Sequence, residues 1–266
     1  MTKGILCYYS GSGNTRLACK YIVGRLTFPF DLLDVVQNSK VDLEPYGVVG
    51  FATFTDFLAP PYFYRAFIER LPRQKSRPAF VFNTYGSYSG QTLRILEKTV
   101  TAKGFVVIAG QSLHTPESYP PMIARGKGAE DMPDEEQMKD LDAFISDLGQ
   151  RLEQVQKRQR VEGKRLRIGL LNSMLPALPR TTARRDMGHK FVDETLCTEC
   201  GTCEKGCPYE AIRLEPKPVF DTSKCYGCWR CYNRCPMHAI STEKYSNGPY
   251  YPKPLDQLTE KLRIQT

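Results

Sequence analysis

Short apolar runs alternate with amphipathic stretches through the first 150 residues. Runs that predict buried strands lie at residues 4–9, 30–36, 46–52, 79–83 and 105–111. Helical periodicity occurs near residues 14–26, 61–71, 89–103 and 134–160. Apolar strands that alternate with helices are typical of a parallel sheet covered on both faces. The sequence therefore predicts an α/β domain that binds its ligand at the carboxyl edge of the sheet.

Cysteine is concentrated in a repeat near the C-terminus. Eight of the ten cysteines lie between residues 197 and 235, in two copies of Cys-x2-Cys-x2-Cys-x3-Cys-Pro. The other two, Cys7 and Cys19, fall in a predicted strand and a predicted helix, where we expect buried thiols. A disulfide framework would not leave the 177 residues before the repeat without a cysteine. We therefore interpret the repeat as a metal site.

Charge divides the chain into parts. Basic and acidic residues balance within residues 1–150 and within residues 191–266. Residues 151–190 contain 11 basic and 3 acidic residues and so carry the whole net charge of +8. We predict an N-terminal domain (1–150), a basic connector (151–190), a cysteine-rich domain (191–245) and a tail (246–266). The tail is expected to be extended and to end in a short helix.

The connector is expected to begin as a charged helix that reaches Arg167. An apolar segment follows at residues 168–179, and we expect it to pack between the two domains, with a membrane surface or a protein partner as the alternative. No run reaches the roughly 18 apolar residues of a transmembrane helix. Because the N-terminus shows no signal-peptide pattern, we expect a cytoplasmic protein. The basic stretch lacks interleaved aromatic residues, which disfavours nucleic-acid binding.

The cysteine repeat resembles the bacterial ferredoxins that hold two [4Fe–4S] clusters. Zinc sites usually show paired Cys-x2–4-Cys knuckles with a longer spacer, which two complete four-cysteine runs do not match. In the bacterial pattern the cysteine before the proline serves the other cluster. The resemblance implies two crossed ligand sets: Cys197, Cys200, Cys203 and Cys235 for one cluster, and Cys225, Cys228, Cys231 and Cys207 for the other.

A loop rich in serine and glycine follows the first predicted strand. Three hydroxyls, two glycines and the start of a helix suit a terminal phosphate group. The loop has no lysine, which disfavours a nucleoside triphosphatase, and it lacks the third glycine of a dinucleotide fingerprint. It resembles the phosphate-binding loop of flavodoxins, and this resemblance implies FMN as cofactor. The loop consists of Ser10, Gly11, Ser12, Gly13, Asn14 and Thr15.

Loops after the third, fourth and fifth predicted strands fit the same resemblance. In flavodoxins the first two of these loops enclose the isoalloxazine ring, where aromatic side chains stack and backbone groups contact the ring edge. The resemblance implies these flavin contacts: Thr53, Phe54, Thr55, Asn83, Thr84, Tyr85, Gly86, Tyr88 and Gly90, with Phe57 as a further aromatic candidate. The polar loop 114–121 is expected either to cover the flavin or to meet the cysteine-rich domain. We do not expect His114 to act as a catalytic base.

The whole chain resembles the flavodoxin–ferredoxin fusion proteins of anaerobic bacteria and archaea, over roughly residues 1–150 and 190–245. This implies a flavodoxin-like, doubly wound five-stranded parallel sheet and a small α+β two-cluster ferredoxin domain. Clusters pass one electron at a time, whereas flavin exchanges one or two. The expected function is electron transfer between two [4Fe–4S] clusters and FMN, which requires no catalytic acid or base.

Two other functions stay open at this point. The flavin could reduce a small molecule such as a quinone, a nitro compound or oxygen, or the chain could be an electron-transfer or docking subunit of a larger redox enzyme. The basic connector favours redox partners with acidic surfaces, such as a small ferredoxin or a larger oxidoreductase. The sequence does not decide between electron carrier and enzyme, nor the oligomeric state, a homodimer included.

Overall fold

A parallel sheet of five strands forms the centre of the N-terminal domain in the computed structural model, which describes residues 3–166 and 168–264. The strands are β1 (Lys3–Tyr8), β2 (Phe30–Asp34), β3 (Tyr46–Phe54), β4 (Arg77–Tyr85) and β5 (Phe105–His114). Their order, β2-β1-β3-β4-β5, is that of flavodoxin-like doubly wound folds. The predicted fold class is confirmed.

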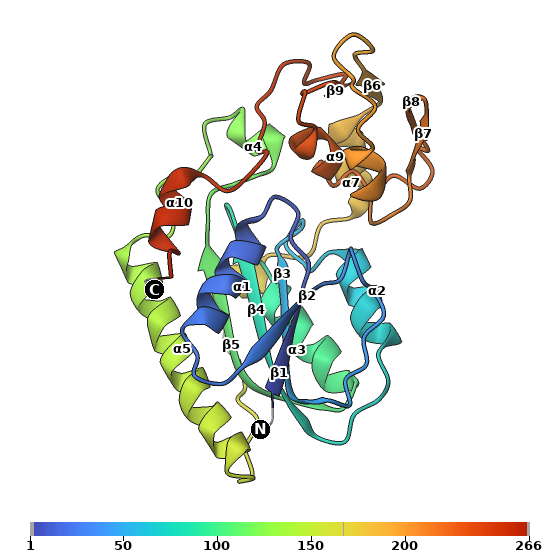
Figure 1. Cartoon of the computed structure of the whole chain (residues 1–266). Helices are drawn as coiled ribbons and strands as arrows, with labels where there is room; N and C mark the ends of the chain where they lie inside the picture. The colour runs from blue at the N-terminus through green and yellow to red at the C-terminus, as the bar shows by residue number, and fades with distance from the viewer. Residues whose placement is uncertain (1–2, 167, 265–266) are drawn as a thin grey trace.

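Helices cover both faces of this sheet, which explains why its strands read as continuous apolar runs. One core lies beneath α1 (Asn14–Gly24) and α5 (Glu135–Gln156), and the other beneath α2 (Tyr62–Arg70) and α3 (Thr92–Ala102). Because the strands are parallel, the loops after β1, β3, β4 and β5 all emerge at one edge, at the top of the sheet in Figure 1. The short helix α4 (Pro120–Ile123) belongs to the loop region after β5.

The cysteine-rich domain lies over this carboxyl edge of the sheet (Figure 1). It has two antiparallel strand pairs: β6 (Lys190–Val192) with β9 (Ile240–Thr242), and β7 (Ile212–Glu215) with β8 (Lys217–Phe220). Two short helices, α8 (Thr202–Lys205) and α9 (Arg230–Arg234), each contain the third cysteine of one repeat copy. Trp229 and Tyr232 are the large side chains of its small core.

The first part of the connector differs from the prediction. Helix α5 ends at Gln156, so the charged helix expected to continue to Arg167 is wrong for residues 157–166, and Arg167 itself lies outside the described residues. Leu152 is the last buried position of α5, and beyond it only the partly buried Val155 and Val161 pack against the core, which is too little apolar surface to hold a long helix. The chain instead turns back beside β5, where the backbone N–H of Lys164 donates to the carbonyl of Val107 at 2.8 Å.

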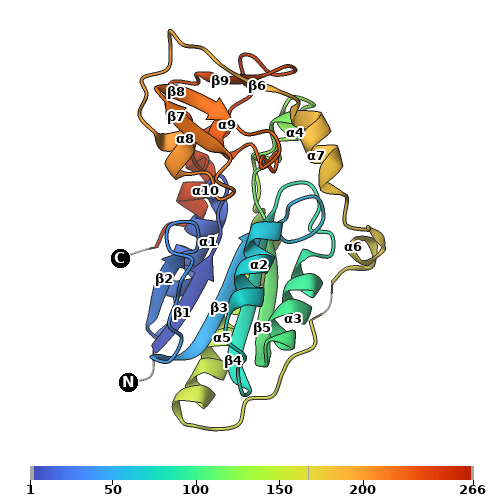
Figure 2. The same ribbon diagram turned by 90° about the vertical axis from the view of Figure 1, so that its right-hand side faces the viewer.

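The apolar segment at 168–179 packs between the domains only in its second half. Its helix α6 (Leu170–Met174), at the side of the molecule in Figure 2, leaves Leu170, Leu171 and Met174 exposed. Leu175 and Leu178, which follow, line a cavity between the domains. Helix α7 (Arg180–Met187) then leads into the cysteine-rich domain. No described helix is both long enough and apolar enough to cross a membrane.

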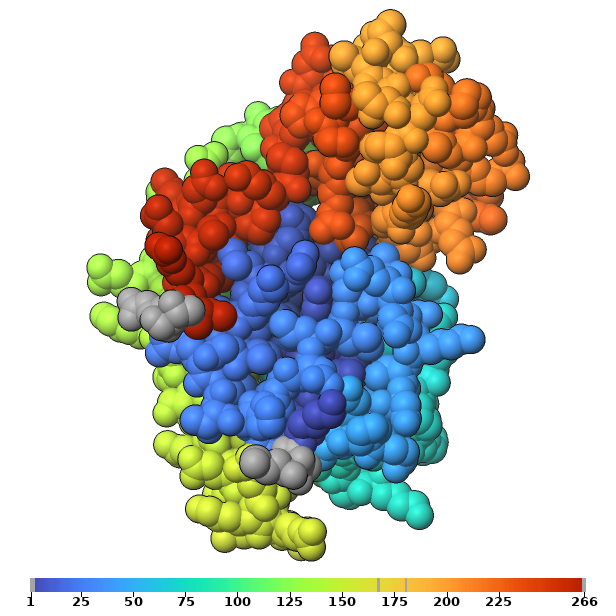
Figure 3. Space-filling model, viewed as in Figure 1, coloured from blue at the N-terminus to red at the C-terminus, as the bar shows by residue number. Residues whose placement is uncertain are grey.

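The C-terminal tail returns to the N-terminal domain. It has the expected form, an extended stretch followed by the short helix α10 (Asp256–Lys261). Leu258 and Leu262 are buried in the core that α1 and α5 share. In Figure 3 the tail, coloured red, crosses the surface from the cysteine-rich domain to the blue N-terminal part. The tail therefore ties the two domains together, which its sequence did not predict.

Candidate functional site

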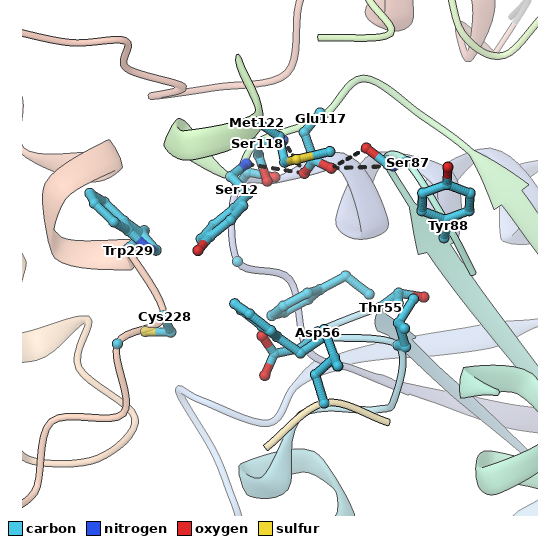
Figure 4. Close-up of a pocket in the computed structure, with 18 of the residues that line it drawn as sticks. Ser12, Thr55, Asp56, Ser87, Tyr88, Glu117, Ser118, Met122, Cys228 and Trp229 are labelled. Carbon is cyan, nitrogen blue, oxygen red and sulfur yellow. Dashed lines mark hydrogen bonds between the residues drawn. The ribbon is translucent and has the colours of Figure 1, made fainter. Parts of the chain in front are cut away.

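A cavity of about 400 Å³ lies between the carboxyl edge of the sheet and the cysteine-rich domain. Figure 4 shows Cys228 and Trp229 on one side of it and Ser87 and Tyr88 on the other. The loops after β1, β3, β4 and β5 all contribute to its wall, and the volume lies within the range of cofactor sites. The sequence-predicted flavin contacts that line it are Gly11, Ser12, Phe54, Thr55, Gly86 and Tyr88, and Phe57 lines it too.

The other predicted contacts lie outside this lining: Ser10, Gly13, Asn14, Thr15, Thr53, Asn83, Thr84, Tyr85 and Gly90. Several of them fix the loops that do line the cavity. The side-chain amide of buried Asn83 donates to the hydroxyl of Thr55 at 3.1 Å. The hydroxyls of Thr15 and Thr84 share a 2.8 Å hydrogen bond, which joins the predicted phosphate loop to β4.

The predicted phosphate loop closes on itself. The hydroxyl of Ser10 accepts hydrogen bonds from the backbone N–H groups of Gly13 (3.1 Å) and Arg16 (3.2 Å). Gly13 has a φ of 113°, and a Cβ there would lie 2.8 Å from the ring of Pro254 in the tail. Glycine is therefore required both for its backbone conformation and for the close approach of the tail.

Two buried asparagines connect this loop to the rest of the site. Asn14 donates to the carbonyl of Pro116 and accepts from the hydroxyl of Tyr251, both at 3.0 Å. Asn233 donates to the carbonyl of Ser118 at 2.9 Å and accepts from the backbone N–H of Tyr251 at 3.2 Å. The loop at 114–121 thus meets the cysteine-rich domain, which is one of the two arrangements expected from the sequence.

Glu117 is a cavity residue to which the sequence assigned no role beyond a place in a polar loop. Its carboxylate accepts hydrogen bonds from the backbone N–H groups of Ser87, Ser118 and Tyr119 at 3.0–3.2 Å, and from the hydroxyl of Ser87 at 3.2 Å. Burial raises the pKa of Glu117, and these hydrogen bonds oppose that effect. A side chain at Gly86 would overlap the carboxylate, so glycine at that position makes room for it.

Arg230 brings a positive charge from the cysteine-rich domain to the phosphate loop. Its side chain is buried, and its guanidinium donates to the carbonyl of Ser10 and, at 3.4 Å, to that of Gly11. The pKa of neighbouring Arg234 is lowered to about 10, first by burial and then by the charge of Arg230. No role of Arg230 was predicted from sequence; a basic residue between two candidate ligand cysteines was the only available signal.

The two crossed cysteine sets each surround a separate small cavity. Cys197, Cys200, Cys203 and Cys235 line one, and Cys207, Cys225, Cys228 and Cys231 line the other. The structure therefore brings together the groups that the ferredoxin resemblance implies. Among the described residues, no three His, Cys, Asp or Glu side chains converge as one ion would require. Thiols spread around a cavity suit a cluster of several iron atoms better than a single zinc ion.

Cys228, Trp229 and Arg230 line both the second cysteine cavity and the 400 Å³ cavity. The indole of Trp229 is 2% exposed and separates the second cysteine cavity from solvent. Its Nε1 donor has no hydrogen-bond partner among the described residues. Tyr226, which lines the second cysteine cavity, stacks on Tyr209 with ring centroids 4.4 Å apart.

Comparison with known proteins separates the same two parts of the chain. Residues 196–239 match the family described as 4Fe-4S dicluster domain. Rubredoxin oxygen:oxidoreductase from the anaerobe Desulfovibrio gigas is similar over 59% of this chain and 37% of its own (12% identity, TM-score 0.44). Flavodoxin 1 from Bacillus cereus is similar over 56% of this chain and 98% of its own (17% identity, TM-score 0.42). A search of curated proteins gives no match.

The strand order and the family match together define the class of protein. The N-terminal domain has the flavodoxin-like fold, and the C-terminal domain is an iron–sulfur domain of the [4Fe–4S] kind. The chain thus joins a domain of flavodoxin-like fold to a segment that matches the 4Fe-4S dicluster family, which supports the resemblance to flavodoxin–ferredoxin fusions. The chain spans only 37% of the Desulfovibrio oxidoreductase, and the strand order rather than that likeness carries the fold assignment.

Proposed function

We propose that the protein binds FMN in the 400 Å³ cavity, holds two [4Fe–4S] clusters on the crossed cysteine sets, and transfers electrons between clusters and flavin. The observation that carries this proposal is the position of Cys228. It belongs to the second cysteine set and also forms part of the cavity wall. This position supports the proposal, because a candidate ligand of one cluster then borders the candidate flavin site. Bound FMN supplies one- or two-electron chemistry, and the clusters supply one-electron chemistry.

The residues of the cavity suit FMN. Phe54, Phe57 and Tyr119 offer aromatic surface for an isoalloxazine ring. The unpartnered Nε1–H of Trp229 is a hydrogen-bond donor for a flavin acceptor atom. The hydroxyl of Ser12 and the nearby guanidinium of Arg230 suit a phosphate group. The protein's part in the reaction is to hold, orient and shield the cofactors.

We call Cys197, Cys200, Cys203 and Cys235 the outer cysteine set, and the set that includes Cys228 the inner one. We expect external redox proteins to exchange electrons at the outer set. Cys200 is exposed, and Met237 beside the same cavity is 43% exposed. None of the four cysteines of this set lines the flavin cavity. Electrons would therefore pass from a one-electron partner to the outer cluster, then to the inner cluster and the flavin, or in the reverse direction. An acidic ferredoxin or a larger oxidoreductase is the partner class that the basic connector favours.

Anaerobic purification followed by cofactor analysis tests the proposal. We expect about eight iron atoms, eight acid-labile sulfides and one FMN per chain. In rapid mixing with dithionite, cluster and flavin reduction should be coupled, with an internal rate constant that does not depend on protein concentration. Kinetically independent reduction would contradict electron transfer within the chain. Eight irons without FMN, even after reconstitution, would instead favour a docking or subunit role.

A further inference from the structure

Lys190 brings an ammonium group to the inner cysteine set. It lies on β6 and lines the cavity of that set, and its Nζ donates to the Sγ of Cys225 at 2.9 Å. The same Nζ lies 4.9 Å from the centre of the Phe220 ring, and it is close enough to Cys231 to interact with it electrostatically. Contacts within the chain therefore hold this ammonium beside the sulfurs of the inner set.

The positive charge of Lys190 has no counter-charge nearby. No ion pair joins it to a carboxylate in the part of the chain that the structure describes. Apart from the cysteines, the other ionisable group of opposite or equal strength in the lining of this cavity is the guanidinium of Arg230, which is also positive. The carboxylates of Asp56 and Glu117 line the flavin cavity and not this one. The inner set therefore has positively charged surroundings.

The outer set has different surroundings. Glu199 is the charged side chain in the lining of its cavity. Lys217 lies beside this lining, but its ammonium donates to the backbone carbonyl of Cys197 at 2.7 Å and pairs with the Glu199 carboxylate at 3.0 Å. The hydroxyl of Thr202 shares a hydrogen bond of 3.2 Å with the Sγ of Cys200. A neutral group thus contacts a sulfur of the outer set, where a cation contacts a sulfur of the inner one.

This difference matters for redox chemistry because reduction of a [4Fe–4S] cluster adds one negative charge to the cluster and its thiolates. Positive charge nearby and hydrogen bonds donated to the sulfurs both stabilise the added charge, and both raise the reduction potential. A hydrogen bond from a charged donor is stronger than one between neutral groups. The ammonium on Cys225 should therefore act more strongly on the inner cluster than on the outer one.

We propose that Lys190, through its hydrogen bond to Cys225, raises the reduction potential of the inner cluster and so draws electrons from the outer cluster toward the flavin. This inference rests on the proposed function, because it requires a cluster on the inner set. Lys190 acts through a ligand sulfur and carries no electron itself. The inference adds a direction to the proposed function, since the inner cluster, which borders the flavin cavity, attracts an electron that enters at the outer set.

A reductive titration of the cluster-loaded protein under anaerobic conditions, followed by EPR, tests this inference. Lys190→Met keeps most of the side-chain length without the ammonium. In this variant the ratio of reduced to oxidised inner cluster at a given potential should fall at least about tenfold, a shift of about 59 mV for one electron. The outer cluster should change less than about twofold. Solvent exposure also affects potentials, but this substitution leaves the exposure of the outer set unaltered.

Two sets of controls complete the titration. Cys200→Ser and Cys228→Ser each remove a ligand of one set, so they assign the two reduction steps to the outer and the inner cluster. Lys224→Gln is the matched control for charge: this lysine is exposed and precedes Cys225 in the sequence, and its removal should change neither cluster more than about twofold. Lys190→Arg keeps a cation and N–H donors, and its inner cluster should stay within about threefold of the wild type.

A spectroscopic measurement on the wild type covers the case in which Lys190→Met does not retain the inner cluster. In protein that contains lysine labelled with nitrogen-15 at Nζ, pulsed EPR of the reduced inner cluster should show coupling to that nitrogen. The labelled Lys190→Arg protein should lack this coupling, while its inner cluster is still reduced. The coupling therefore reports the contact between the ammonium and the ligand sulfur without relying on a destabilised variant.

Unchanged potentials in a folded Lys190→Met protein with both clusters would overturn this inference, as would a wild-type spectrum without the nitrogen-15 coupling; in both cases the proposed function would stand. Equal shifts of both clusters would overturn it too, because they would show a general effect on the domain and not a contact with one ligand. A wild-type protein that holds no iron on the inner set would overturn both the inference and the proposed function. Iron analysis and the titration thus separate the two failures.

Discussion

Burial determines the chemistry of the two cysteines outside the repeat. Cys7 on β1 and Cys19 on α1 are both 0% exposed, one beneath each face of the sheet. Burial raises the pKa of Cys7 to about 12 and raises that of Cys19 further. The thiolate is the reactive form of cysteine, so these side chains are inert in the folded protein. The expectation that both are buried thiols is confirmed.

We expect neither Cys7 nor Cys19 to react with iodoacetamide when the cluster-loaded protein is treated anaerobically near pH 8. Both should react after unfolding in the presence of a chelator, and mass spectrometry of the peptides locates the label. Chelation of the iron without unfolding is the control, since it should expose only cysteines of the repeat. Labelling of either residue in the native protein would show that the core opens more readily than its packing indicates.

Glu117 makes stability depend on pH. Burial raises its pKa above the ordinary value of 4.5, so the folded protein binds this proton more tightly than the unfolded chain does. The stability that it contributes is present at lower pH and is lost as the pH rises from about 4.5 through the folded pKa. In Glu117→Gln the group cannot ionise. We expect the Tm of the wild type minus that of Glu117→Gln to decrease from about pH 5 to pH 8 in calorimetry; a constant difference would contradict this.

The short helix α10 attaches the C-terminal tail to the N-terminal domain. Leu258 and Leu262 fill the core shared by α1 and α5, and the ammonium of Lys261 donates to the carbonyls of Asp131 and, at 3.0 Å, Pro133. The extended stretch before it lies against the phosphate loop at Gly13. This element therefore acts as a clasp that holds the ferredoxin domain over the sheet.

Leu258→Ala should destabilise the protein by about 2–5 kcal/mol, because it leaves a cavity in that core. It should also make the tail more susceptible to proteolysis than the rest of the chain. Denaturant unfolding and limited proteolysis measure the two effects. Gln257→Ala, on the exposed side of the same helix, is the matched control and should stay within about 0.5 kcal/mol of the wild type. A Leu258→Ala protein with unchanged stability would show that the clasp is weakly held.

The elements also show why some predictions from sequence succeed and others fail. Strands β1, β3 and β4 could be recognised because burial on both faces makes them largely apolar. The charged helix after Gln156 was wrong because helix propensity alone, without an apolar face to bury, does not fix a helix. The clasp was missed since Leu258 and Leu262 form only one apolar pair, whose partner surface lies more than 100 residues away. Glu117 and Arg230 were missed for the same reason: their roles come from contacts between distant segments.

In the whole molecule, the sites form a series that runs from the outer surface of the ferredoxin domain to the sheet. The outer cysteine set has an exposed member, Cys200. The inner set shares Cys228 with the wall of the flavin cavity. The crossed arrangement connects the outer and inner cysteine sets, because each repeat copy contributes one cysteine to the set formed by the other copy. The proposed electron transfer would then have an order, and this order can be tested by removing one candidate ligand at a time.

Two serine substitutions should have opposite consequences along this series. Cys200→Ser removes a ligand of the outer set, so reduction by an external ferredoxin should slow while exchange between the inner cluster and the flavin persists. Cys228→Ser removes a ligand of the inner set, so the outer cluster should still be reduced while reduction of the flavin slows at least about tenfold, a rise of about 1.4 kcal/mol in its barrier. Rapid mixing with reduced ferredoxin, followed at cluster and flavin wavelengths, separates the two cases.

Iron content, expected to fall from about eight to about four atoms in each variant, serves as the control for cluster loss. Flavin reduction by ferredoxin at the wild-type rate in Cys200→Ser, despite loss of the outer cluster, would mean that the two clusters do not lie in series, and that electrons reach the flavin by another route.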